Sequence, residues 1–450
     1  MEVHMEGITM KVFKNLSILV IIMLTTCDSA EVSISSFVIV DGTRFTIDHK
    51  PYYFLGTNMW YGANLGMEGE RGDRKRLIKE LDFLEDMGVT NLRVLGASEG
   101  LGEYFQVKPA IQPQPGVYDE DVLVGLDFLL NEMSRRGMYA VIYLNNNWEW
   151  TGGFSQYVCW VTGENYPNPN MAEYSWGDFM NFTGRFYITP EANELYRKYV
   201  RHLITRVNTI NGRMYRDDPT IMSWQLANEP RPRYRDDDPE SIKIFIQWIY
   251  ETAAFIKSLD PNHLVSSGNE GLAGSLESEE CYLKAHECEQ IDYMTFHLWL
   301  LNWQWFDPHH ADSTYPRAEE KAMNYIHQHI QYAKKLNKPI TLEEFGIPRD
   351  GHSYSPESTT SYRDRYFKTV FDAIYESAKD DSPFAGSNFW AWGGYGRASD
   401  PEGESIWKEG DDFTGDPPQE PQGRNSVFAY DESTIQLLID HGARMRALIK

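Results

Sequence analysis

The chain has 450 residues, of which 24% are charged and 42% are hydrophobic, a composition typical of a folded globular protein. It carries 66 acidic against 42 basic side chains, which gives a formal net charge of -24. Such a surface repels nucleic acid and anionic lipid, so the charge argues against a polyanionic partner and suits a neutral ligand.

The first residues have the pattern of an export signal. Lys11 and Lys14 precede the apolar run Leu16–Leu24, which is shorter than the roughly 20 apolar residues of a permanent membrane span. Cys27 comes just after this run, and its position resembles that of the acylated cysteine in a bacterial lipoprotein signal. Simple cleavage and lipid anchoring at Cys27 both remain open. Either one predicts a secreted protein without an integral membrane span.

Beyond this segment, short β-type runs alternate with longer amphipathic stretches, as in a parallel α/β fold. Phe37–Ile47 predicts a small hairpin around Asp41-Gly42 that closes the floor of a barrel. Eight strands then follow, the number that a closed (β/α)8 or TIM barrel requires. They are predicted at Tyr52–Thr57, Thr90–Leu95, Tyr139–Leu144, Ile221–Leu226, Leu264–Ser267, Tyr293–Phe296, Ile340–Leu342 and Ser387–Trp390.

The stretches between these strands predict helices. Arg74–Met87 places Leu77, Leu81 and Leu84 on one face and ends before Gly88, a good helix stop. Further helices are predicted at Leu123–Arg136, Ser241–Leu259 and Ala318–Leu336.

Two long loops, Trp148–Phe186 and Arg397–Ser426, follow strands and should lie at the end of the barrel that carries active sites. With no linker or appended module in the pattern, we expect an export segment at 1–30 and one barrel domain at 31–450.

Three cysteines lie beyond the export segment. Export permits a disulfide, and Cys281–Cys288 is the natural pair because both fall in one predicted loop, which leaves Cys159 free. Paired Cys or His residues with structural-zinc spacing are lacking, so we expect no metal site.

Two glutamates stand where predicted strands end. Ile221–Leu226 runs into Ala-Asn-Glu229-Pro230, and Pro230 ends the strand because it has no N–H to donate. The seventh strand ends in the same way at Glu344, just before Phe-Gly. A carboxylate at the end of a buried strand is costly unless it is paired or useful.

Hydrolysis of a glycoside needs such a pair, one acid for the leaving oxygen and one carboxylate as nucleophile or base. The alternative is that both glutamates only form salt bridges with arginines of the barrel.

The sequence resembles glycoside hydrolase family 5 over nearly the whole chain after residue 35. The strings TNLRVLGAS, SWQLANEP, YMTFHLW, TLEEFG and NFWAWGG are similar to strands two, four, six, seven and eight of that family, in order and at barrel spacing. The resemblance implies that Glu229 is the general acid/base and Glu344 the nucleophile of a retaining reaction. It favours Glu344 over Glu343, and strand alternation predicts that Glu343 faces the helical shell or a neighbouring loop.

The resemblance also assigns supporting residues. Arg93 would bond the nucleophile and hold its pKa down, while Glu229 would have a raised pKa. Asn228 would donate to the sugar 2-hydroxyl, His297 would line the site beside the acid, and Trp390 would form its floor. Many family members have a tyrosine two residues after the histidine. Here that residue is Trp299, whose indole donates but does not accept.

Within the family, the sequence resembles the endo-β-1,4-mannanase branch. The similarity lies in GTNMWYG, in NNW followed by Gly-Gly, and in NEPR, which adds Trp60, Asn147, Trp148 and Arg231 to the expected substrate-binding residues. We therefore expect a monomeric enzyme acting on β-mannan without a metal or organic cofactor. Alternatives are a β-1,4-glucanase, an exo-acting β-mannosidase and a non-catalytic glycan-binding protein.

Overall fold

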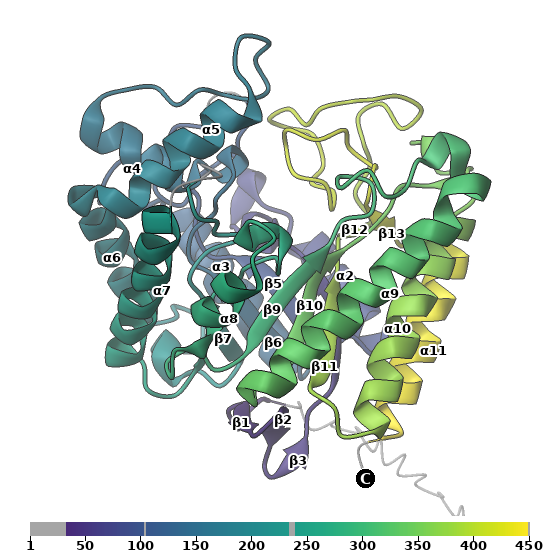
Figure 1. Cartoon of the computed structure of the whole chain (residues 1–450). Helices are drawn as coiled ribbons and strands as arrows, with labels where there is room; N and C mark the ends of the chain where they lie inside the picture. The colour runs from purple at the N-terminus through teal and green to yellow at the C-terminus, as the bar shows by residue number, and fades with distance from the viewer. Residues whose placement is uncertain (1–32, 103–104, 234–238, 449–450) are drawn as a thin grey trace, which may run out of the picture. The chain divides into compact units, whose positions relative to one another are not determined.

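Eight parallel strands form the centre of the molecule in the computed structural model, which describes residues 33–102, 105–233 and 239–448 (Figure 1). Their order is β8-β7-β6-β5-β4-β11-β10-β9, so strands that follow one another in the chain pair, except β8 and β9, and the last strand, β11, pairs with the first, β4. The Asp292 N–H donates to Val265 O at 2.8 Å where β9 and β8 meet, which leaves the barrel nearly closed. The strands are β4 Phe54–Asn58, β5 Asn91–Leu95, β6 Tyr139–Tyr143, β7 Ile221–Gln225, β8 Leu264–Ser266, β9 Met294–Leu298, β10 Ile340–Phe345 and β11 Phe384–Phe389.

All eight strands were predicted, with ends that differ by a few residues, and the predicted (β/α)8 fold is confirmed. Every residue of these strands is buried, as expected for a parallel sheet covered by helices.

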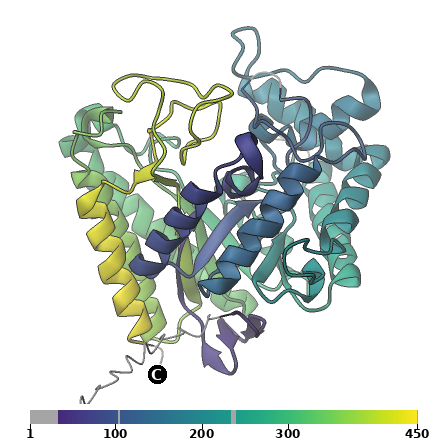
Figure 2. The same cartoon turned by 180° about the vertical axis from the view of Figure 1, so that it is seen from behind.

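Helices surround the barrel (Figures 1 and 2). Those of the described residues are α1 Gly62–Gly66, α2 Arg74–Met87, α3 Glu120–Arg135, α4 Gly153–Thr162, α5 Trp176–Thr183, α6 Pro190–Ile204, α7 Pro239–Leu259, α8 Glu279–Glu287, α9 Ala311–Leu336, α10 Ser361–Lys379 and α11 Glu432–Arg446. None of them combines the length with the apolar composition that crossing a bilayer requires.

Local signals explain where these helices begin and end. Helix α2 has the predicted bounds, because Asp73 accepts from the Arg76 N–H at its start and Gly88 takes φ 84° at its end. Helix α3 starts three residues earlier than predicted, because the Asp119 side chain accepts from the first backbone N–H groups and caps it there.

The predicted hairpin is present and gains a third strand, forming β1 Ile39–Asp41, β2 Arg44–Ile47 and β3 Lys50–Pro51. Its buried Phe45 packs edge-on against Tyr293, with ring centroids 5.2 Å apart, and against Phe54 of β4 at 6.4 Å. The hairpin therefore seals the end of the barrel where the strands begin, at the bottom of Figure 1.

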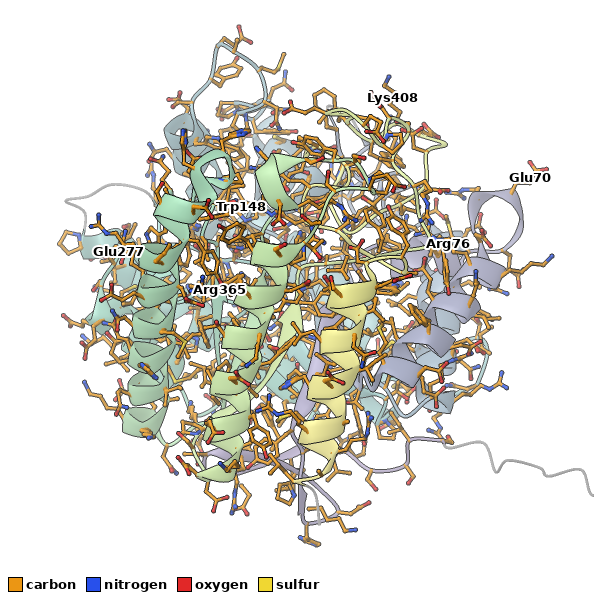
Figure 3. The ribbon with its side chains drawn as sticks, turned by 90° about the vertical axis from the view of Figure 1, so that its right-hand side faces the viewer. Glu70, Arg76, Trp148, Glu277, Arg365 and Lys408 are labelled. Atoms are coloured by element: carbon orange, nitrogen blue, oxygen red, sulfur yellow. The ribbon has the colours of Figure 1, made fainter. Side chains whose placement is uncertain are left out.

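The two long loops lie at the opposite end of the barrel, at the top of Figure 1. The first carries α4 and α5, and the second is flanked at its base by β12 Trp392–Gly394 and β13 Val427–Phe428, which pair in parallel. Figure 3 labels Lys408 on the second loop, pointing outward, and Trp148 among the side chains beneath it.

The chain divides into a unit of residues 1–31 and a compact unit of residues 32–450. The predicted export segment, including Cys27, lies outside the described residues.

The prediction of a Cys281–Cys288 disulfide is wrong. The two residues do not share a loop, since Cys281 lies in the first turn of α8 and Cys288 caps its end, and both are free thiols. Seven residues along a helix span about 10 Å, well beyond the roughly 4.4–6.8 Å between the Cα atoms of a disulfide.

Alkylation of the unfolded, non-reduced protein tests this geometry. We expect peptide mapping to find Cys159, Cys281 and Cys288 all alkylated, because all three are free thiols in the structure. A reduced sample is the control and should give the same pattern. A linked Cys281–Cys288 peptide before reduction would contradict the structure.

Candidate active site

Glu229 lies on a backbone segment that is held from two sides. The Asn228 N–H donates to Asn145 O at 2.8 Å, and the Asn147 N–H donates to Asn228 O at 2.9 Å, both from the loop after β6. The Glu229 N–H donates to Gly268 O at 3.0 Å, after β8. Glu229 takes φ 50°, a left-handed conformation that is uncommon outside glycine and costly unless the surroundings impose it. The three backbone hydrogen bonds hold Glu229 in this conformation.

Glu344 lies on β10, beside a bulge. Leu342 pairs with Phe296 of β9 and Glu344 pairs with the next residue, His297, so Glu343 is an extra residue without a partner in this pairing. A bulge interrupts the alternation of side chains that a regular strand would show.

The prediction that Glu343 faces the helical shell or a loop is therefore wrong. Its carboxylate lies inside the barrel, where Gln225 Nε2 donates to Oε2 at 2.5 Å and Arg93 Nε lies 3.8 Å away. The Tyr293 hydroxyl donates to Oε1 at 3.4 Å. Burial raises the pKa of Glu343, while Arg93 lowers it.

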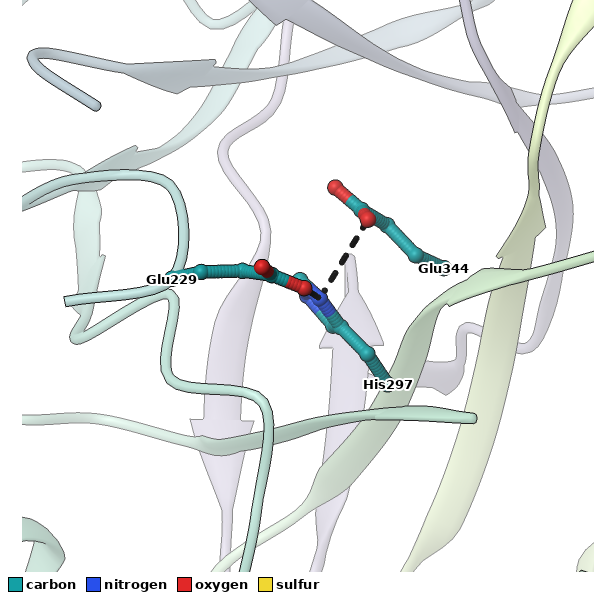
Figure 4. Close-up of side chains that lie close together, drawn as sticks. All are labelled: Glu229, His297 and Glu344. Carbon is teal, nitrogen blue, oxygen red and sulfur yellow. Dashed lines mark hydrogen bonds and ion pairs between the residues drawn. The ribbon is translucent and has the colours of Figure 1, made fainter. Parts of the chain in front are cut away.

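Glu229 and Glu344 come together across the mouth of the barrel, with His297 between them (Figure 4). One carboxylate oxygen of each glutamate and a ring nitrogen of His297 all lie within 4.8 Å of one another. The glutamates are 5% and 3% exposed. Carboxyl groups that act by retention are about 5–5.5 Å apart, whereas inversion needs roughly 6.5–9.5 Å to admit a water. This separation fits retention.

Two side chains fix the carboxylate of Glu229. Trp148 Nε1–H donates to Oε2 at 2.5 Å, and His297 Nδ1 lies 2.6 Å from Oε1. His297 Nδ1 is also 3.4 Å from Glu344 Oε2. Burial, together with the nearby Arg93, holds the pKa of His297 well below its usual value, so the ring is neutral. A neutral imidazole can form a hydrogen bond with the Glu229 carboxyl without adding a positive charge to the site.

Arg93 organises the other side of the pair. Its Nη1 donates to Glu344 Oε1 at 2.5 Å and its Nη2 donates to Asn228 Oδ1 at 2.7 Å. Asn228 in turn donates through Nδ2 to Asn146 Oδ1 at 3.1 Å, so its amide has one orientation.

Burial raises the pKa of Glu344 well above its ordinary value; Arg93 lowers it and Glu229 raises it further. Arg93 bonds Glu344 and lowers its pKa, as expected, but burial outweighs this effect, so the net direction in the free protein is upward.

Three of the other predicted substrate-binding residues, Arg231, Trp299 and Trp390, lie beside the catalytic pair. Arg231 lies 5.0 Å above the Trp148 ring and forms a salt bridge with the buried Glu270. Trp299 packs edge-on against Trp390, with centroids 6.0 Å apart, beside the barrel mouth.

Asn147 and Trp60 are buried and bond to neighbouring parts of the protein. Asn147 is 2% exposed and its side chain donates to Met180 Sδ. Trp60 is 1% exposed and its Nε1–H donates to Gly415 O at 3.0 Å, so it supports the second long loop. Their predicted contact with substrate stays a prediction.

Sequence reasoning missed three residues of this network. Asn58 Oδ1 and Gln225 Oε1 accept from Arg93 at 3.1 and 2.8 Å, and Glu270 neutralises Arg231. Asn58 is the last residue of β4, so its position at a strand end was a usable signal. Gln225 is likewise the last residue of β7, whereas Glu270 lies four residues beyond β8 and carried no comparable signal.

A metal ion would find ligands here. Glu229, His297 and Glu344 are the described residues whose ligand atoms cluster closely enough to hold one. Arg93 already donates to Glu344 and the neutral Trp148 indole donates to Glu229, so both carboxylates have donors from the chain and Arg93 supplies a positive charge.

Two adjacent carboxylic acids at the C-terminal mouth of a (β/α)8 barrel are the arrangement of a glycoside hydrolase. The family model for glycoside hydrolase family 5, β-mannosidase-like, matches residues 35–450. The chain therefore belongs to glycoside hydrolase family 5, as its sequence motifs predicted.

Relatives support this assignment. The chain is 30% identical to mannan endo-1,4-β-mannosidase 4 of Solanum lycopersicum, over 83% of this chain and 87% of that protein. It is 38% identical to the family 5 mannosidase of Rhizomucor miehei, with a TM-score of 0.84 over 92% of this chain and 99% of that one. It is 26% identical to the endo-β-1,4-mannanase of Thermotoga petrophila, with a TM-score of 0.63 over 88% and 77%.

Replacement of Glu344 tests the pair. We expect Glu344→Gln to lower kcat by about 10⁴-fold or more, since an amide cannot serve as the nucleophile. Glu343→Gln, one residue away, is the matched control and should keep measurable turnover. Circular dichroism should show both variants folded. Comparable activity in Glu344→Gln and the unmodified enzyme would remove the assignment.

Glu99 supports the loop that carries Trp148. Its carboxylate is 1% exposed and accepts from the Gly153 N–H at 3.0 Å, at the start of α4. Burial raises the pKa of Glu99 to about 8. The folded state therefore holds a proton that the unfolded state releases above its ordinary pKa of about 4.3, and stability from this group is lost as pH rises through about 8.

Glu99→Gln should remove this dependence. The amide keeps an acceptor for Gly153 and cannot ionise, so the melting temperature of the variant should rise relative to the unmodified protein between pH 5 and pH 9. Thermal unfolding across this range measures the difference. The exposed Glu70→Gln is the control, with no such trend expected. A pH-independent difference for Glu99→Gln would show that the buried carboxyl does not bind this proton.

Proposed function

We propose that the protein is an endo-acting, retaining β-1,4-mannanase that uses Glu344 as nucleophile and Glu229 as general acid/base. The observation that carries this proposal is the short separation of the two buried carboxyl groups. The substrate class rests on the mannan endo-1,4-β-mannosidases among the relatives, at about 30% identity over most of the chain.

In this mechanism a Glu344 oxygen attacks the anomeric carbon while Glu229 gives its proton to the leaving oxygen. The covalent glycosyl-enzyme is then released by a water that Glu229 deprotonates. Arg93 stabilises the carboxylate of Glu344 before attack and when it leaves. Trp148 holds the Glu229 carboxyl in place through both steps.

Substrate is held by the neighbouring side chains. Asn228, whose amide is fixed by Arg93, is placed to bond the 2-hydroxyl of the reacting sugar. Trp390 and Trp299 offer ring faces for the same sugar. Arg231, stacked on Trp148, is placed to meet a sugar on the leaving-group side.

An exo-acting β-mannosidase is the second candidate. It is favoured by the higher identity and TM-score to the Rhizomucor miehei mannosidase, at 38% and 0.84, than to the Thermotoga petrophila endo-mannanase, at 26% and 0.63. A structure of that mannosidase contains mannosyl-fructose.

We also propose that the enzyme is exported, with lipid anchoring at Cys27 and simple cleavage as the two forms. The feature that supports export is the pair of lysines before the apolar run Leu16–Leu24.

Product analysis tests the activity. On glucomannan and mannohexaose we expect mixed mannooligosaccharides from the first minutes, with the β-anomer formed first in proton NMR because retention conserves configuration. Carboxymethyl cellulose and the Glu344→Gln variant are the controls. Mannose as the first and only small product would favour the exo candidate. Hydrolysis of carboxymethyl cellulose instead of mannan would contradict the substrate class.

A further inference from the structure

A second pocket lies beside the active site, on the first long loop and the turn that precedes α3. Its volume is about 460 Å³, within the roughly 300–1,000 Å³ of small-molecule sites. Residues that give it chemical character are Gln106, Gln156, Trp160, Tyr166, Asn168 and Tyr174.

Aromatic rings separate this pocket from the reacting pair. Tyr166 of the pocket packs on Phe179 of α5 at 6.1 Å, and Phe179 stacks on Trp148 at 6.4 Å. Trp148 in turn donates to Glu229. The pocket therefore lies behind the side chain that holds the acid, and its lining shares no residue with the catalytic pair or its hydrogen-bond partners.

A buried amide in the pocket lacks a partner for its donor group. Asn168 is 2% exposed and its Oδ1 accepts from the Asn170 N–H at 2.9 Å, which fixes the amide orientation. Its Nδ2 is buried and has no hydrogen-bond partner within the described part of the chain. A buried donor without a partner is unfavourable, so a ligand acceptor that pairs with it would be bound favourably.

The rest of the lining matches a neutral polyol with apolar faces. Tyr174 is 42% exposed and Met171 is 39% exposed on the rim, so a ring surface is available without rearrangement. Gln106, 3% exposed, donates to the Tyr166 hydroxyl at 3.2 Å and holds that ring in place. Glu173 is the one residue of the lining with a formal charge at neutral pH. Aromatic faces pack on sugar C–H surfaces, and amides bond sugar hydroxyls.

We propose that this pocket is an accessory carbohydrate site that holds a pyranose of the β-mannan chain away from the point of cleavage. Asn168 Nδ2 would donate to a sugar hydroxyl and Tyr174 would pack on the ring. The identity of the sugar rests on the proposed function, whereas the site itself rests on the pocket and its unpaired amide.

Binding without turnover tests the site. In the Glu344→Gln background, migration through native gels containing galactomannan or glucomannan gives a dissociation constant for the polymer. Asn168→Asp keeps the acceptor for Asn170 and replaces the donor, so we expect polymer binding to weaken about fivefold or more. Tyr174→Ala should weaken it similarly, while Tyr174→Phe, which keeps the ring, should not.

Exposed Ile210, on a loop outside the pocket lining, supplies the control variant Ile210→Ala, which should bind as the parent does. In the active enzyme, Asn168→Asp and Tyr174→Ala should raise KM on the polymer and leave kcat/KM on mannotriose unchanged, because a trisaccharide does not reach both sites. Melting temperatures check that the variants are folded.

Unchanged polymer binding in both Asn168→Asp and Tyr174→Ala would overturn the proposal, as would a parent protein that the polysaccharides do not retard. An equal loss of kcat/KM on mannotriose and polymer would also overturn it, since that pattern belongs to the catalytic site. Failure of the proposed function is separate: the active enzyme would then hydrolyse no mannan, whatever the gel experiment in the inactive background gives.

Discussion

The buried guanidinium of Arg93 is the interaction on which the site depends. Arg93, on β5, is fully buried and donates to Asn58 on β4, to Gln225 at the end of β7 and to Glu344 on β10. A buried cation is costly unless it is paired and hydrogen-bonded, so the strands can close around it only in a register that supplies these acceptors. The same contacts that stabilise the charge place Glu344 at the barrel mouth.

The position of Glu229 depends on Arg93 through Asn228, and on two loops that hold its backbone and its carboxyl. Arg93 orients the Asn228 amide. Backbone hydrogen bonds from the loops after β6 and β8 hold Glu229 in its left-handed backbone conformation. Trp148, from the first long loop, then fixes its carboxyl. A barrel strand supplies the nucleophile and loops supply the support of the acid, which agrees with the location of active sites at this end of such barrels.

The sequence was most informative where a pattern is local. Eight apolar runs separated by amphipathic stretches predicted the barrel, and the strings that end at Pro230 and Gly346 marked the segments that carry the two glutamates. Asp73 and Gly88 fixed helix α2, for which cap and stop lie within one segment.

Features that depend on partners far away in sequence were not predictable in this way. The bulge at Glu343 arises from pairing with β9, and no residue near it marks the extra position. Gln225 is 132 residues from Arg93, so its role appears only when the strands are assembled. The Cys281–Cys288 pairing failed because α8 is a short helix whose polar sequence was taken for a loop. The pKa of Glu344 also required the folded state, since its direction follows from the depth of burial.

The most direct test of the account is to trap the covalent intermediate. A 2-deoxy-2-fluoro-β-mannosyl fluoride should form the covalent glycosyl-enzyme and then hydrolyse from it only slowly. Fluorine beside the anomeric carbon destabilises the oxocarbenium-like transition state of that hydrolysis. Peptide mass spectrometry of the digest is predicted to find one sugar, attached to the carboxylate of Glu344. A sugar on Glu343 or on Glu229, or inactivation without any covalent label, would contradict it.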